Sequence, residues 1–269
     1  MLCMPILRLR LVWRTYMPGQ KKTVFITGGS TGIGAASVRK FAESGWNVAF
    51  MDINVEDGQA VAQDTGALFV EGNTRNREDI DKAVAAAIEK YGELDCVVAN
   101  AGIHRCNTML TISEEELDLM IDTNIKGTVR TLQAAVPSIL RKGGSVVINA
   151  SDQSYIGKAN SFGYGLTKGA LGQITKSLAI DLGRQNVRVN AVCAATIRTP
   201  LAINLFQKFA DITHNGDASA YWKAEAELYP LGRVGEAPEV AELIYFLASD
   251  SASFITGGLY LIDGGLVAG

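Results

Sequence analysis

One pattern repeats along most of the chain: a short run of β-branched and apolar residues, a turn, and then an amphipathic run of helical length. The clearest helical runs fall at 77–92, 113–141, 162–183 and 236–249. Strands that alternate with such helices are typical of βαβ units, which form a parallel sheet with helices on both faces. We therefore predict a doubly wound α/β fold with a seven-stranded parallel sheet. The predicted strands are residues 23–27, 47–51, 67–71, 94–100, 144–150, 187–195 and 257–265.

The domain organisation follows from length and from the first residues. A chain of 269 residues without a linker, repeat or low-complexity tract fits one large α/β domain, here residues 17–269. Residues 1–16 carry three arginines and no acid, and these arginines interrupt the apolar core that a secretory signal requires. A transit peptide and an ordered extension are alternatives, but we favour translation from Met17. No run approaches the ~20 apolar residues needed to span a bilayer.

Charge and cysteine usage exclude several classes of protein. The net charge of −3 and pI near 5.5 provide no basic surface for nucleic acid. The four cysteines show no CxxC spacing, and His104 and His214 are far apart, so we predict no disulfide framework and no metal site. A reducing, cytoplasmic setting is the simplest interpretation.

A glycine-rich turn, residues 27–34 (TGGSTGIG), follows the first strand and opens a helix. Glycines let the backbone turn sharply and approach a pyrophosphate, which rests on the N–H groups of the helix start. Asp52 ends the second strand, 24 residues after Gly28, where a carboxylate can accept hydrogen bonds from ribose hydroxyls. It would repel a 2′-phosphate, and no Lys or Arg lies in the turn or at 52–54. We therefore predict NAD rather than NADP. The alternative is a solvated loop acid.

A second group of residues could transfer a proton. Tyr164 and Lys168 are four residues apart, so a helix places them on one face. Ser151 lies just beyond the fifth strand and thirteen residues before Tyr164. A free phenol titrates near ~10 and works poorly as a base at neutral pH, so it needs a neighbouring cation.

In this order and spacing the motifs resemble the short-chain dehydrogenase/reductase family, from Lys22 to Gly265. They include the C-terminal run SFITGGLYLIDGG as well as the residues named above. The resemblance implies a single Rossmann-type domain and an NAD-dependent oxidoreductase that acts on a secondary alcohol or ketone. The remaining motifs that carry it are Asn100-Ala101-Gly102, Asn124 and Ile197-x-Thr199.

The resemblance also implies roles for individual residues. Tyr164 is expected to be the general acid/base, and Lys168 to lower its pKa together with a positive nicotinamide. Ser151 would hold the reacting oxygen. Asn124 would perturb its helix and keep a water that relays protons to Lys168. The implied cofactor contacts are Gly28, Ser30, Thr31, Gly32, Ile33, Gly34, Asp52, Ile53, Asn73, Thr74, Asn100, Ala101, Gly102, Tyr164, Lys168, Ile197 and Thr199.

Several positions depart from the family pattern. Ala194-Ala195 replaces a usual Pro-Gly, and the Cβ of Ala195 restricts the backbone near the nicotinamide. Asn73 replaces an Asp that commonly contacts adenine. Its amide oxygen can still accept a hydrogen bond, so altered affinity is expected rather than loss. Ala99 and Ala150 are milder changes.

The substrate is less constrained. We predict contacts from His104, Gln153, Tyr155 and Lys158, which favour a polar alcohol such as a sugar, polyol or hydroxy acid. The periodicity weakens over 199–229, and this segment is expected to be a substrate lid. Phe206 and Phe209 within it could instead cover a cyclic or steroid-like ketone.

The sequence also allows two alternative functions and more than one oligomeric state. The chain could be a catalytically idle NAD-binding sensor or scaffold, which the complete proton-transfer group argues against, or an NADPH-dependent reductase. The resemblance implies a homo-oligomer, a dimer or homotetramer, paired through the long helices that begin near Ser113 and Phe162.

Overall fold

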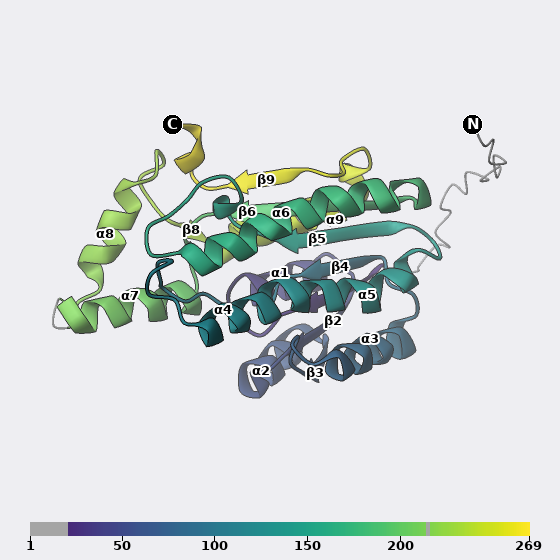
Figure 1. The fold of residues 1–269 in the computed structure, drawn as a ribbon. Helices are drawn as coiled ribbons and strands as arrows, with labels where there is room; N and C mark the ends of the chain where they lie inside the picture. The colour runs from purple at the N-terminus through teal and green to yellow at the C-terminus, as the bar shows by residue number, and fades with distance from the viewer. Residues whose placement is uncertain (1–20, 214–215) are drawn as a thin grey trace, which may run out of the picture.

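The computed structural model describes residues 21–213 and 216–269 (Figure 1). The predicted N-terminal extension at 1–16 and His214 lie outside the described residues.

Seven strands form one parallel sheet in the order β3-β2-β1-β4-β5-β6-β9. The direction of winding reverses between β1 and β4, and a ligand cleft forms at the carboxyl ends of strands at such a point. The predicted fold class is confirmed. The strands are β1 (Thr23–Thr27), β2 (Asn47–Asp52), β3 (Leu68–Glu71), β4 (Cys96–Ala99), β5 (Gly144–Asn149), β6 (Val187–Ala194) and β9 (Leu259–Ile262).

Helices cover both faces of the sheet. On one face α3 (Arg77–Tyr91), α5 (Gly127–Ile139) and α6 (Phe162–Leu182) bury Ile80, Leu132 and Leu171 in one apolar core. On the other face α1 (Gly32–Glu43), α2 (Val55–Thr65) and α9 (Ala237–Ala248) bury Val38, Val61 and Ile244 in a second core. All five residues of β1 are buried, as expected for a central strand covered on both sides. No helix in the described ranges is long and apolar enough to cross a bilayer.

The predicted helix at 113–141 is interrupted. Ser113 caps α4 (Glu114–Met120) by accepting a hydrogen bond from the Glu116 N–H. A π-helical turn (Ile121–Lys126) then precedes α5. Asn124 lies in that turn and is buried, and π-helical turns of this kind are frequent at functional sites.

The segment at 199–229 forms two helices, α7 (Pro200–Thr213) and α8 (Ser219–Glu227), where the sequence showed only weak periodicity. They lie beyond the carboxyl ends of the strands (Figure 1). A small parallel sheet of β7 (Ile197–Arg198) and β8 (Gly235–Glu236), absent from the sequence prediction, brackets this segment.

Candidate active site

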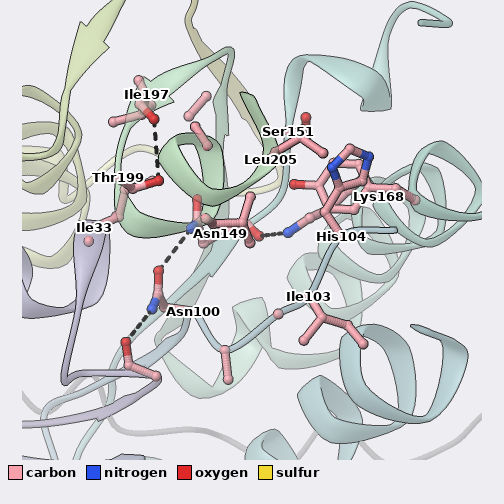
Figure 2. Close-up of a pocket in the computed structure, with 18 of the residues that line it drawn as sticks. Ile33, Asn100, Ile103, His104, Asn149, Ser151, Lys168, Ile197, Thr199 and Leu205 are labelled. Carbon is pink, nitrogen blue, oxygen red and sulfur yellow. Dashed lines mark hydrogen bonds between the residues drawn. The ribbon is translucent and has the colours of Figure 1, made fainter. Parts of the chain in front are cut away.

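A cavity of about 500 Å³ lies at the carboxyl ends of the strands, between the glycine-rich turn and α7 (Figure 2). Except for Ser30, every residue predicted to contact the cofactor lines it. Of the predicted substrate contacts, His104, Gln153 and Lys158 line it and Tyr155 does not. Distant motifs of the sequence thus meet in one cleft.

The glycine-rich turn needs its glycines for conformation and for space. Gly28 and Gly32 have φ angles of 69° and 54°, which side chains disfavour. A Cβ at Gly34 would overlap the carbonyl oxygen of Gly28. The turn therefore leaves a cradle over the first N–H groups of α1, and such a cradle fits a phosphate group.

Asp52 is held at the end of β2 by two backbone N–H groups. Ser30 N–H and Asn54 N–H each donate to its carboxylate at 3.0 Å. Ser30 does not line the cavity, because it is buried and its hydroxyl donates to the Asn54 carbonyl at 3.1 Å, and its contact with the cofactor stays a prediction. Ser30 instead fixes the loop that presents Asp52.

A chain of hydrogen bonds joins the glycine-rich turn to Lys168 (Figure 2). Asn100 Nδ2 donates to the Gly28 carbonyl at 2.9 Å, and Asn100 Oδ1 accepts from Asn149 Nδ2 at 2.8 Å. The Asn149 carbonyl then accepts from Lys168 Nζ at 2.7 Å. Sequence reasoning missed Asn149, whose only signal was a polar residue ending a buried strand.

Two of the departures from the family pattern are accommodated. Ala194 and Ala195 line the cavity without a left-handed backbone, and Ala195 N–H donates to the Ile262 carbonyl at 3.2 Å. Asn73 also lines the cavity, but its Oδ1 already accepts from the Arg75 N–H at 3.0 Å. Its amide oxygen therefore has one lone pair left for a ligand.

Asn124 connects three parts of the site. Its Oδ1 accepts from Ile103 N–H at 2.8 Å, and its Nδ2 donates to the Ile103 carbonyl at 2.9 Å and to Thr167 Oγ1 at 3.0 Å. A Cβ built on Gly102 would lie 3.3 Å from Asn124 Oδ1 and 3.8 Å from Lys168 Nζ. Asn124 and Lys168 thus flank the same glycine, and the predicted water relay between them stays a prediction.

Ser151, Tyr164 and Lys168 come together at the centre of the cavity. Lys168 Nζ lies 5.4 Å from the centroid of the Tyr164 ring. The His104 ring packs edge-on against the same tyrosine, with the two ring centroids 4.5 Å apart. Burial raises the pKa of the Tyr164 phenol, Asp152 raises it further, and a hydrogen bond with Ser151 opposes both. Burial lowers the pKa of Lys168 to about 8. In the protein alone, burial thus outweighs the hydrogen bond with Ser151. The expected lowering of the Tyr164 pKa when the oxidised cofactor is bound stays a prediction.

The substrate end of the cavity is polar. His104 Nε2 lies 3.1 Å from Ser161 Oγ, and burial, followed by Arg105 and two lysines, lowers the His104 pKa to about 4, so the ring is neutral at neutral pH. Tyr155 does not line the cavity and its hydroxyl donates to the Leu259 carbonyl at 2.7 Å, so its contact with substrate stays a prediction.

One carboxylate at this end was not foreseen. Glu225 reaches the cavity from α8 and accepts hydrogen bonds from Thr196 Oγ1 and from Tyr229 Oη at 2.9 Å. No local signal in the sequence marks it, because its position depends on how α8 folds back.

The comparisons with known proteins agree with this geometry. Residues 28–267 match the family described as Enoyl-(Acyl carrier protein) reductase. Oxidoreductase UcpA of Salmonella typhimurium is 36% identical over 251 residues, which cover 91% of this chain and 94% of UcpA. The chain belongs to the short-chain dehydrogenase/reductase family.

Two further proteins similar to this chain are named as sugar dehydrogenases. L-fucose dehydrogenase of Mus musculus is 36% identical, with 92% of this chain and 89% of that protein covered. The ligand-free structure of aldohexose dehydrogenase from Thermoplasma acidophilum superimposes with a TM-score of 0.84 at 32% identity, covering 93% and 95% of the two chains.

Membership makes the protein an oxidoreductase of alcohols and ketones that uses a nicotinamide cofactor. The dehydrogenase cleft fits such a group, because its glycine cradle, its fixed Asp52 and the buried Thr199 line one continuous cavity. Thr199 Oγ1 donates to the Ile197 carbonyl at 3.3 Å, which sets the loop facing Gly32 (Figure 2).

Proposed function

We propose that this enzyme is an NAD-dependent dehydrogenase that oxidises a secondary hydroxyl of a neutral, polyhydroxylated ring such as a sugar. One observation carries the proposal: the cavity that holds Ser151 and Tyr164 is lined by the hydrogen-bonding side chains of His104, Gln153, Lys158 and Glu225, and Lys158 is already ion-paired with Asp152. A site built to bond hydroxyl groups discriminates strongly against analogues that lack them.

The cofactor preference rests on Asp52. Its two carboxylate oxygens are held by backbone N–H groups, so the side chain cannot move away from a ribose. A 2′-phosphate at this place would meet that fixed negative charge, and neither Arg nor Lys occurs at 28–34 or 52–54 to offset it.

The substrate charge follows from the cations of the cavity. Lys158 and Lys168 are the basic residues among the described lining side chains. Lys158 Nζ is ion-paired with Asp152 at 2.7 Å, and Lys168 is buried against Asn149. A carboxylate substrate would have to compete for Lys158 and would also face Glu225. This favours a sugar or neutral polyol over a hydroxy acid. The names of L-fucose dehydrogenase and aldohexose dehydrogenase support the same choice.

The proton path uses the chain's own residues. The nicotinamide, when bound, supplies the hydride acceptor for oxidation. Ser151 Oγ orients the substrate oxygen, and the Tyr164 phenolate takes the hydroxyl proton as the C–H bond breaks. Lys168 holds a positive charge 5.4 Å from the Tyr164 ring centroid and stabilises the phenolate.

An apolar cyclic ketone is the second candidate, because Leu205 and Phe206 of α7 line the cavity. Phe206 is nevertheless 8% exposed and packs edge-on against Trp222 at 4.6 Å, so much of its ring is used inside the segment. The side chain of Phe209, the other predicted apolar contact, lies outside the described residues.

The test is cofactor reduction followed by absorbance across four substrate groups: aldohexoses with L-fucose, cyclitols, hydroxy acids and cyclic apolar alcohols. We expect the highest kcat/KM with a neutral sugar and NAD. Asp52→Ser should reduce the NAD over NADP preference by about tenfold, about 1.4 kcal/mol. Asp64→Ser, at the far end of α2, is the matched control. Higher kcat/KM with NADP in the native enzyme would contradict the cofactor assignment, and turnover confined to apolar alcohols would favour the second candidate. Tight NAD binding with no turnover in any group would identify a sensor.

A further inference from the structure

A buried carboxylate that the proposed mechanism does not use lies directly behind Ser151. Asp152 is 1% exposed and begins a short 3-10 turn (Asp152–Ser154). Ser151 Oγ donates to Asp152 Oδ1 at 2.8 Å, and Ser151 Oγ itself accepts a hydrogen bond from the Gln153 N–H at 3.2 Å. The proton of the Ser151 hydroxyl is therefore directed toward Asp152.

The other oxygen of the Asp152 carboxylate forms an ion pair with a lysine that lines the cavity. Lys158 Nζ lies 2.7 Å from Asp152 Oδ2, and the Lys158 side chain is 26% exposed and lines the cavity. Removal of one partner from a buried ion pair leaves an uncompensated charge, so the two residues act as a unit. The buried member contacts Ser151, and the other member faces the space where substrate would bind.

We propose that Asp152 is a positioning residue of the proton-transfer site: its carboxylate fixes the Ser151 hydroxyl, and Lys158 compensates its charge from the substrate side. This inference rests on the proposed dehydrogenase function but not on the identity of the substrate. Neither residue belongs to the set that the sequence motifs assigned to catalysis.

The charge of Asp152 acts on Tyr164 in one direction. It disfavours the Tyr164 phenolate, whereas the hydrogen bond with Ser151 favours that phenolate. Asp152 is second only to burial among the causes that raise the Tyr164 pKa. Lys158 counteracts the charge of Asp152.

Other charged and titratable groups face the same place and must be held constant. They are His104 after β4, Lys168 on α6, Cys193 on β6 and Glu225 on α8. A test that changes only residues 152 and 158 leaves all four in place.

The test compares Asp152→Asn and Lys158→Met, both of nearly conserved shape. For each variant saturated with its nicotinamide cofactor, the tyrosinate absorbance is titrated and the titration of the same variant carrying Tyr164→Phe is subtracted, which isolates the ionisation of Tyr164. We expect the midpoint to fall by about one pH unit in Asp152→Asn and to rise by about one unit in Lys158→Met. The acidic limb of kcat/KM for alcohol oxidation should move in the same two directions.

Lys82→Met, an exposed lysine lost from α3, is the control and should move neither quantity. Midpoints that stay unmoved in both variants, or that move in the same direction, overturn the role of Asp152. If Asp152→Asn does not fold, a higher Tyr164 titration midpoint in Lys158→Met still supports the proposal. An unchanged midpoint in Lys158→Met still overturns it. The titration requires no substrate, so failure of every sugar in the turnover assay would overturn the substrate proposal alone.

Discussion

At the scale of single residues, burial works against both charged forms that the reaction needs. It raises the pKa of Tyr164 and lowers that of Lys168 to about 8. Each charged form therefore depends on a neighbour, such as the other residue of the pair or the positive nicotinamide of the oxidised cofactor. Perturbed pKa values of this kind are common at functional sites, where stability is sacrificed for chemistry.

Tyr164→Phe tests the phenol with little change of shape. Without the hydroxyl the enzyme has no group to exchange the proton, so kcat should fall by about 10²–10⁴. The affinity for NAD should change little, because the glycine-rich turn and Asp52 hold the rest of the cofactor. Stopped-flow turnover and calorimetric NAD binding measure the two quantities. Near-native turnover would remove Tyr164 from its role.

Lys168 makes a prediction about stability and pH. Its pKa is about 8 in the folded protein and about 10.4 when unfolded, so between these values the unfolded chain binds more protons. The free energy of unfolding should therefore rise with pH across that interval, by about 3 kcal/mol in total from this group. In Lys168→Met the rise should be lost, as measured by urea unfolding at pH 7.5 to 10. A slope that is the same in both proteins would show that Lys168 does not cause it.

The spacing of residues in the sequence suggested Ser151, Tyr164 and Lys168 as one group, and the resemblance to the family was needed to assign their roles. Asp152 and Glu225 could not be found that way. The role of Asp152 depends on Lys158 returning to it through a loop, and that of Glu225 depends on the fold of α8. Such contacts are tertiary and leave no periodic signal.

At the scale of elements, the α7–α8 segment is tied to the loop that faces the cofactor. The Arg198 guanidinium of β7 lies 4.2 Å from the Trp222 ring centroid, and Trp222 also packs edge-on against Phe206. Arg198 further pairs with Glu236 of β8 at 3.3 Å. Movement of α8 is thus coupled to the residues beside Ile197 and Thr199.

Trp222→Ala should therefore weaken substrate capture more than it weakens folding. The stacked cation and the aromatic pair are each worth about 0.5–1.5 kcal/mol, so KM should rise about tenfold while kcat and the melting temperature change little. Steady-state kinetics and thermal unfolding separate these effects. Lys223→Ala, exposed on the same helix, is the control. An unchanged KM would show that this contact does not position the segment.

Periodicity was enough to predict the long elements but not the short ones. The two-residue strands β7 and β8 pair Ile197 with Gly235 across 37 intervening residues and have no period of their own. The π-helical turn in the predicted 113–141 helix depends on Asn124 bonding to Ile103 and Thr167, which local propensity does not register.

At the scale of the whole molecule, the two apolar cores cover both faces of the sheet but leave part of α6 exposed. Phe162, Leu166 and Ile180 are 41%, 44% and 82% exposed, and their spacing of four and fourteen residues places them along one stripe of the helix. The exposed polar residues Gln173 and Ser177 lie between Leu166 and Ile180 on the same face, so the stripe combines apolar contacts with hydrogen-bonding groups, as many interaction surfaces do. We propose that the stripe pairs with a second copy of this chain, as the resemblance to the family suggested.

A charge placed at Ile180 would have to be buried in that interface without a partner. Ile180→Glu should therefore convert the oligomer to a smaller species, at a cost of several kcal/mol that is enough to dissociate a dimer at micromolar concentration. Light scattering on a size-exclusion column measures the mass directly. Ala85→Glu, exposed on α3 near the β3 edge, should leave the mass unchanged. An oligomer of native mass in Ile180→Glu would locate the assembly surface elsewhere. Because Ile180 lies far along α6 from Tyr164, the substitution should not disturb the cleft directly. A smaller species that retains turnover would therefore show that the cleft is complete within one chain.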